Sequence, residues 1–319
     1  MIPKNIVLKL VSIAYGGKSI GNKLRIHIET LGVSLELNKI LKKGTIVKIN
    51  KEIGIFAADV KEFKLPLTIQ VIEKDIRYDD TEKNAVTITP NLALTTIQKF
   101  TSTIRVAEMR KRSKGSEATF EFIFSVQTQD AIRYIGASEQ GFLLVKTMEN
   151  ENLSLPSFLN VKFDYRKDKR DYFTVLEGSE KEKKFSIKLD KKSTSFLHAG
   201  NVYMDPIKAQ YSKSTKILTL NDKKYQTIDS PYEPWAKRLY DIEIPDAPHE
   251  LGRPYLQKTS KSLVWFRIGH DGEKYIHTGQ TTLGCITVLE HEKWNEIYDV
   301  LIRARKGDSK SIGTLKVID

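Results

Sequence analysis

The chain has 319 residues, 40% of them hydrophobic and 29% charged, which is typical of a globular protein with its own core. No stretch approaches the roughly 18 uninterrupted apolar residues of a membrane-spanning helix, so we expect no transmembrane segment. The net charge of +12 predicts attraction to an anionic surface. The sharpest basic runs, residues 109–114 and 165–170, lack interleaved aromatic residues, so we expect no specific nucleic-acid partner.

The N-terminal part of the chain alternates apolar and polar residues in the manner of β-strands. The pattern is clear in residues 24–29 and again in residues 120–126. Short strands separated by Gly, Asn, Asp and Lys turns predict an antiparallel, sandwich-like domain over residues 1–127. Residues 1–14 are interpreted as its first strand rather than as a signal peptide, because Lys9 interrupts the apolar run.

The rest of the chain is also predicted to be mainly β. Residues 128–200 form a β-rich extension or a second small domain, and residues 201–319 form a C-terminal unit. Residues 262–269 are dense in apolar side chains and predict a buried strand. One helix is predicted over residues 290–305. Its apolar stripe consists of Trp294, Ile297, Tyr298, Leu301 and Ile302.

Cys285 is the only cysteine in the chain and therefore cannot form an internal disulfide. It is a buried spectator, a metal ligand without thiol partners, or a nucleophile. Gly284 permits a tight turn before it, and His277 lies eight residues upstream, close enough to serve as a base. A zinc site from His270, His277 and Cys285 matches no usual ligand spacing, so we predict neither a metal nor another cofactor.

Residues 282–286, Thr-Leu-Gly-Cys-Ile, with His277 upstream, resemble the active-site signature of the L,D-transpeptidase catalytic domain family. Residues 244–252 and 265–269 resemble a divergent branch of that family that is associated with bacterial secretion or injection machines. The resemblance covers about residues 201–319. It implies an L,D-transpeptidase-like β domain with a helix after the cysteine.

The resemblance also implies roles for individual residues. Cys285 would be the nucleophile, His277 its base, and Thr282 the residue that supports the turn. Gly284, together with the backbone N–H of Cys285, would donate to the oxyanion. By accepting the thiol proton, the imidazole would raise the thiolate fraction of Cys285 at neutral pH.

Two positions depart from the common family pattern. Leu283 stands where other members have histidine, and Thr287 stands where they have an arginine that is credited with holding a substrate carboxylate. These departures leave open a changed substrate, a carboxypeptidase outcome or a loss of activity. The candidate substrate-binding residues, including substitutes for that arginine, are Thr282, His249, Arg267, Trp265, Arg303 and Thr287.

The sequence therefore predicts a cysteine-dependent enzyme acting on peptidoglycan stem peptides through a thioester, as an L,D-transpeptidase or an L,D-carboxypeptidase. Without a clear signal peptide, we expect synthesis in the cytoplasm and action at the cell envelope or after delivery outside the cell. Secretion or injection apparatus proteins are the expected partners. The alternative is a non-catalytic structural or adaptor component of an injection apparatus that binds the cell wall.

Overall fold

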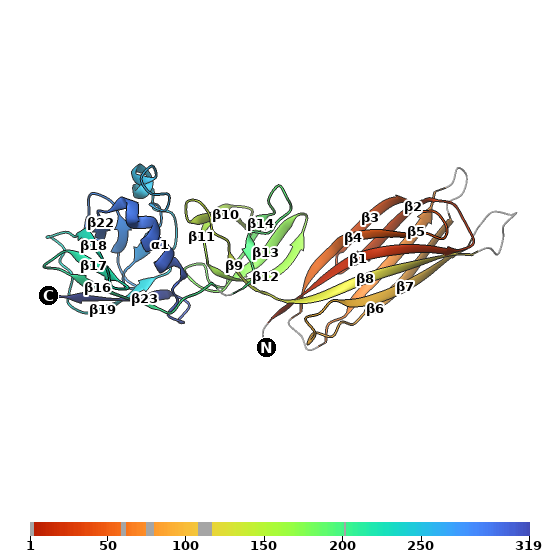
Figure 1. Ribbon diagram of the computed structural model, residues 1–319, viewed down its shortest axis with the longest axis horizontal. Coiled ribbons are helices and arrows are strands. Elements are labelled where there is room, and N and C mark those ends of the chain that lie inside the picture. The colour runs from red at the N-terminus through yellow and green to blue at the C-terminus, as the bar shows by residue number, and fades with distance from the viewer. Residues whose placement is uncertain (1–2, 59–61, 75–79, 108–116, 201) are drawn as a thin grey trace. The chain divides into compact units, whose positions relative to one another are not determined.

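The computed structural model describes residues 3–58, 62–74, 80–107, 117–200 and 202–319 (Figure 1). Contacts divide the chain into two compact units, an N-terminal unit (residues 1–131 with 164–168) and a C-terminal unit (residues 132–163 with 169–319). Both are built mainly of antiparallel strands, as predicted. The basic run at 109–114 lies outside the described residues.

The N-terminal unit contains two four-stranded antiparallel sheets, ordered β4-β1-β8-β7 and β3-β2-β5-β6. The alternation seen in the sequence directs one face of each sheet into a shared core, which includes Ile26 and Ile28 of β2 and Phe122 and Phe124 of β8. The strands are β1 (Lys4–Gly17), β2 (Lys23–Thr30), β3 (Val33–Ile40), β4 (Ile46–Ala58), β5 (Leu65–Glu73), β6 (Asp80–Ile88), β7 (Gln98–Ala107) and β8 (Glu117–Asp130).

The C-terminal unit begins with a seven-stranded sheet of order β11-β10-β14-β13-β12-β9-β15. The second basic run, residues 165–170, covers the end of β12, a tight turn and the first residue of β13; in the turn Asp168 and Lys169 both have positive φ, 50° and 58°. The strands are β9 (Ile132–Ile135), β10 (Phe142–Thr147), β11 (Asn152–Pro156), β12 (Asn160–Lys167), β13 (Arg170–Val175), β14 (Lys184–Lys188) and β15 (Leu197–His198).

An eight-stranded sheet of order β19-β23-β16-β17-β18-β22-β21-β20 follows. The pairs β16/β23 and β21/β22 are parallel. A bridge between Ile242 and Ile268 joins its first and last strands, so the sheet is a nearly closed barrel. The strands are β16 (Ile207–Ser212), β17 (Ile217–Leu220), β18 (Lys223–Ile228), β19 (Leu239–Glu243), β20 (Phe266–Arg267), β21 (Tyr275–Thr278), β22 (Ile286–Val288) and β23 (Ser311–Ile318).

The predicted helix is present as α1 (Trp294–Arg303), preceded by the 3-10 turn η2 (His291–Lys293). All five residues of the predicted apolar stripe are buried, so the periodicity identified the packed face correctly. Another 3-10 turn, η1 (Glu250–Tyr255), precedes β20. None of the helices in the described ranges is long and apolar enough to cross a membrane.

The predicted strand over residues 262–269 is largely wrong. Its centre is buried, but only β20 is extended, because residues 259–264 form consecutive turns. In those turns the N–H of Val264 donates to the carbonyl of Lys261 over 2.9 Å. Gly269 then turns the chain with a φ of 79°. The density of apolar residues therefore predicted burial correctly. The conformation is determined instead by the hydrogen bonds of the turns.

Arg305 joins the two sheets of the C-terminal unit through a buried ion pair. Its guanidinium donates to Glu177, with the shortest distance 2.8 Å, and also to the carbonyl oxygen of Phe158 over 2.9 Å. The same group donates to the carbonyl oxygens of Ile302 and Ala304, both over 2.7 Å. Phe158 and Glu177 are thereby bonded to the segment that follows α1.

Candidate active site

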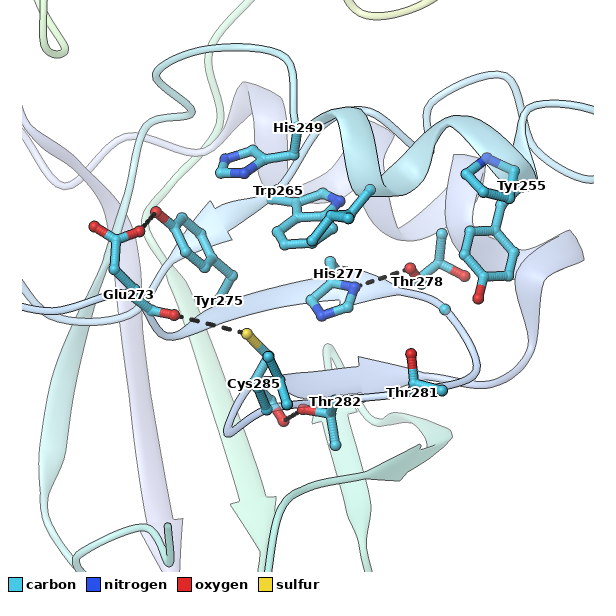
Figure 2. Close-up of a pocket in the computed structure, with 14 residues that line it drawn as sticks. His249, Tyr255, Trp265, Glu273, Tyr275, His277, Thr278, Thr281, Thr282 and Cys285 are labelled. Atoms are coloured by element: carbon cyan, nitrogen blue, oxygen red, sulfur yellow. Dashed lines mark hydrogen bonds between the residues drawn. The ribbon is translucent and has the colours of Figure 1, made fainter. Parts of the chain in front are cut away.

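The parallel pairing of β21 with β22 brings the predicted nucleophile and base to one face of the sheet. His277 lies opposite Thr287 in the register, and Cys285 directly precedes β22. Because side chains two residues apart point to the same face of a strand, Tyr275 and His277 share a face with Cys285 and Thr287. Figure 2 shows the imidazole and the thiol in the same pocket.

The pocket has a volume of about 620 Å³ and is open to solvent (Figure 2). Most of its walls are aromatic, aliphatic or hydroxyl-bearing, and the thiol lies at one side. The lining residues are His249, Leu251, Pro254, Tyr255, Trp265, Glu273, Tyr275, His277, Thr278, Gly279, Thr281, Thr282, Leu283 and Cys285. The volume lies within the range of about 300–1,000 Å³ that is usual for small-ligand pockets.

The hydrogen bonds of His277 fix its tautomer. Nδ1 lies 2.9 Å from the backbone oxygen of Thr278, which can only accept, so Nδ1 carries the proton of the neutral ring. Nε2 is then the acceptor, and the hydroxyl of Thr287 donates to it over 3.1 Å. The lone pair that a general base needs is therefore on Nε2, where the Thr287 hydroxyl occupies it at rest.

Burial keeps the imidazole of His277 neutral. It lowers the pKa of this residue to about 4, the bond to the Thr278 carbonyl opposes the shift, and His249 adds to it. Trp265 stacks on the ring, with centroids 4.0 Å apart and planes inclined by 14°. His277 is therefore held rigidly, in the unprotonated form, at neutral pH.

The thiol of Cys285 is also in its neutral form. Its Sγ donates to the carbonyl oxygen of Glu273 over 3.8 Å. Burial raises the pKa of Cys285; the Tyr275 amide and Lys274 act against this, and Glu233 and Glu273 add to it. Both pKa shifts oppose the expectation that His277 takes the thiol proton and leaves a thiolate at rest. The pocket thus holds a neutral thiol and a neutral imidazole at rest.

Gly284 and Thr282 shape the turn that carries the thiol. Gly284 has a φ of 132°, and a Cβ there would come within 2.9 Å of a Glu233 carboxylate oxygen. The hydroxyl of Thr282 donates to the carbonyl of Cys285 over 2.9 Å and accepts from the N–H of Gly284 over 3.2 Å. The Gly284 N–H, predicted as an oxyanion donor, is thus engaged in holding the turn.

The predicted substrate-binding cations lie outside the pocket. Arg267 donates to Asp246 over 2.9 Å and also lies 3.8 Å from Glu243. Arg303, the last residue of α1, has its guanidinium over the ring of Phe158. These partners cannot be identified from the sequence, which is why both arginines were candidates for binding a substrate anion.

His249 and Trp265 do line the pocket, as a stack. The ring of His249 lies parallel to Trp265, with centroids 4.5 Å apart and planes inclined by 3°. Nε2 of His249 lies 3.4 Å from an Asp246 carboxylate oxygen. Trp265 is therefore enclosed between two imidazoles, His249 and His277, in an order that Figure 2 shows directly.

Three pocket residues, Tyr255, Tyr275 and Glu273, were not identified as functional candidates from the sequence. The hydroxyl of Tyr255 accepts from the N–H of Gln280 over 3.0 Å and fixes the loop after β21. The hydroxyl of Tyr275 donates to the carboxylate of Glu273 over 2.6 Å at the thiol side of the pocket. Tyr275 could have been found from the sequence, because it lies two residues before His277 on the same strand and therefore on the same face. Tyr255 lies too far along the chain for any local pattern to place it.

No group of three His, Cys, Asp or Glu residues in the described part of the chain is placed to hold a metal ion. His270, considered above as a zinc ligand, lies outside the pocket of Cys285. Its ring nitrogens bond instead to Glu243 over 2.6 Å and to Asp241 over 3.1 Å.

A second hollow of about 640 Å³ adjoins the first. It shares Glu273 and Leu283 with the thiol pocket and is otherwise lined by residues such as Trp235, Tyr240 and Lys274. Leu283 is 91% exposed and stands at the boundary of the two hollows. The two hollows therefore meet at Glu273 and Leu283.

Comparison with known proteins adds no family to this description. No protein-family model matches the chain, and no curated protein sequence matches it.

The neutral thiol leads to a prediction for chemical labelling. Because the pKa of Cys285 is raised, we expect iodoacetamide to alkylate it at pH 7 more slowly than it alkylates glutathione. Because the thiolate is the reactive form, the rate should keep increasing with pH beyond the ordinary thiol pKa of about 8.5. Mass spectrometry reports one site, because Cys285 is the only cysteine, and Cys285→Ala supplies the blank. Fast alkylation at pH 7 that disappears in His277→Ala would contradict a neutral resting pair.

Proposed function

We propose that the chain is a cysteine-dependent acyltransferase that acts on peptidoglycan stem peptides, as an L,D-transpeptidase or L,D-carboxypeptidase. The observation that carries the proposal is the placement of Cys285 and His277 on one face of paired strands, in an open pocket, with the Nε2 of His277 unprotonated. The resemblance of residues 282–286 to the L,D-transpeptidase signature supports the choice of substrate.

In the proposed first step, Sγ of Cys285 attacks the carbonyl carbon of the donor amide. The thiol proton passes to Nε2 of His277 as the S–C bond forms, so that neither group needs to be charged beforehand. The Thr287 hydroxyl, which donates to Nε2 at rest, must turn away during this transfer. Transfer coupled to attack is the route that suits a raised thiol pKa and a lowered imidazole pKa.

The tetrahedral intermediate then collapses. The C–N bond breaks, the amine leaves with the proton held on Nε2 of His277, and a thioester to Cys285 remains. We assign the backbone N–H of Cys285 as the oxyanion donor, because the N–H of Gly284 is engaged by Thr282. An amine arriving from the second hollow gives a cross-link, and water gives a trimmed peptide.

One observation favours the rival function, a cell-wall-binding structural component without catalysis. The thiol is protonated at rest, and the Gly284 N–H already has an acceptor. Such a pocket can bind a peptide without cleaving it. Binding without acylation is therefore the outcome that would support the rival.

The experiment is incubation of the full chain with purified tetrapeptide muropeptides, followed by mass spectrometry of both the products and the intact protein. We expect cross-linked or trimmed products, and a protein mass increased by the acyl group on brief incubation. Cys285→Ala should yield neither. Identical product masses for wild type and Cys285→Ala, with no acylated protein, would reject the enzymatic proposal.

A further inference from the structure

Lys274 packs against the turn that carries the thiol, from the side of the second hollow. Its Cε lies 3.5 Å from the position that a Cβ of Gly284 would occupy. Because Gly284 has no side chain, the lysine packs close to the backbone of the turn, next to Cys285. The residue before the lysine, Glu273, accepts from the thiol at its carbonyl oxygen over 3.8 Å. Lys274 therefore lies beside both the cysteine turn and the residue that accepts from the thiol.

The ammonium group of Lys274 is held in place by the loop that follows β18. Nζ donates to the carbonyl oxygen of Glu233 over 3.2 Å and lies 3.5 Å from the carboxylate of the same residue. It also lies 4.9 Å from the centre of the Trp235 ring, a distance typical of a cation–π contact. The lysine side chain is 30% exposed, so solvent and salt screen its charge only in part. A positive charge is thus fixed beside the Gly284 turn.

The charged side chains around Cys285 act on its sulfur in opposite directions. Burial is the largest influence on the pKa of Cys285 and raises it. Lys274 lowers this pKa, and its effect is larger than that of either Glu233 or Glu273, which raise it. Without the lysine, the two carboxylates and burial would act on the thiol together.

Other basic side chains near the pocket have different neighbours. His249 lines the thiol pocket and adds to the burial that lowers the pKa of His277. Nε2 of His249 lies 3.4 Å from Asp246, and Arg267 donates to the same carboxylate over 2.9 Å. Among these groups, Lys274 is the one that packs against the cysteine turn.

We propose that Lys274 is a positioning residue for Cys285, and that its ammonium group stabilises the negative charge that forms on the sulfur as the thiol proton leaves. In the proposed acylation this proton passes to Nε2 of His277 while the S–C bond forms. A cation beside the turn lowers the free energy of that state more than the free energy of the neutral thiol. The inference rests on the proposed function for this step, but its effect on the thiol can be measured without a substrate.

Alkylation of the full chain by iodoacetamide measures the effect, because Cys285 is the only cysteine and the reagent is uncharged. Mass spectrometry follows the rate between pH 7 and 10. Lys274→Met removes the charge and keeps an unbranched side chain, so we expect alkylation at pH 8 to slow by about threefold. Lys274→Arg keeps the charge and should stay near the wild-type rate.

Glu233→Gln separates the effect of charge from the effect of structure. It breaks the same ion pair as Lys274→Met but removes an opposing charge, so we expect alkylation to become about twofold faster. An ion pair that only held the turn in place would make both substitutions change the rate in the same direction. Lys224→Met, in β18 and lining neither hollow, is the matched control and should leave the rate unchanged.

Circular dichroism establishes that each variant is folded, and Lys274→Gln serves as a second variant without the charge. Equal alkylation rates for wild type and both uncharged variants, or slower alkylation of Glu233→Gln, would overturn the inference. The expected order of alkylation rates without acylation by muropeptides would support it while rejecting the enzymatic proposal. Acylation of the wild type without that order would do the reverse. The two claims can therefore fail independently.

Discussion

His277→Ala is expected to lower the rate of acyl transfer by about 10²- to 10⁴-fold, the usual contribution of a positioned general base. Its Nε2 is the acceptor that the thiol proton requires, because Nδ1 is committed to the Thr278 carbonyl. The wild-type rate should hold as pH is lowered from 7 and fall near pH 4, where the imidazole becomes protonated and can no longer accept. A site with an ordinary histidine would lose activity near pH 6.5 instead.

The measurement is the acylation rate between pH 3.5 and 8, with circular dichroism at each pH to establish that the protein is folded. His27→Ala, in β2 of the N-terminal unit, is the matched control and should leave both rate and profile unchanged. A wild-type midpoint near 6.5 would contradict the assigned burial effect. An unchanged rate in His277→Ala would remove the residue from the mechanism.

Arg305→Ala is expected to destabilise the C-terminal unit by about 3–5 kcal/mol, because it leaves the carboxylate of Glu177 buried without its partner. Both side chains are largely buried, with exposures of 11% and 7%. The substitution also removes the donor to the carbonyl of Phe158, which connects the two sheets of this unit. Glu177→Ala in the same background should recover part of the loss by removing the unpaired charge.

Urea unfolding followed by tryptophan fluorescence reports this unit selectively, since all three tryptophans, Trp235, Trp265 and Trp294, belong to it. Arg253→Ala is the matched control, because Arg253 pairs with Glu250 at the surface, where such a bridge is worth below about 1 kcal/mol. Similar midpoints for Arg305→Ala and Arg253→Ala would show that the buried pair contributes little.

The elements that were predicted correctly are those whose conformation depends on residues close together in the sequence. The alternation in β2 and β8 and the apolar stripe of α1 were found because one buried face imposes a period of two or of 3.6 residues. The turn before Cys285 was found from Gly284, whose positive φ favours glycine. These features depend on residues close together in the chain.

The environment of the site depends on residues that are far apart, and sequence could not supply it. Trp265 was proposed as a substrate contact, yet its ring also stacks between the rings of His249 and His277. The expected thiolate assumed only that an imidazole lies near the sulfur, whereas burial shifts both pKa values the other way. Arg267 looked available for substrate until Asp246 was placed beside it.

The closure of the C-terminal sheet has a consequence for how other molecules recognise it. Where Ile242 bridges Ile268 and the N–H of Gly269 donates to Asp241 over 2.7 Å, main-chain groups that could template an incoming strand are already engaged. Recognition at this seam cannot proceed by strand addition. Selectivity falls instead to rim side chains such as Leu251 and Leu283, which can be exchanged without disturbing the barrel.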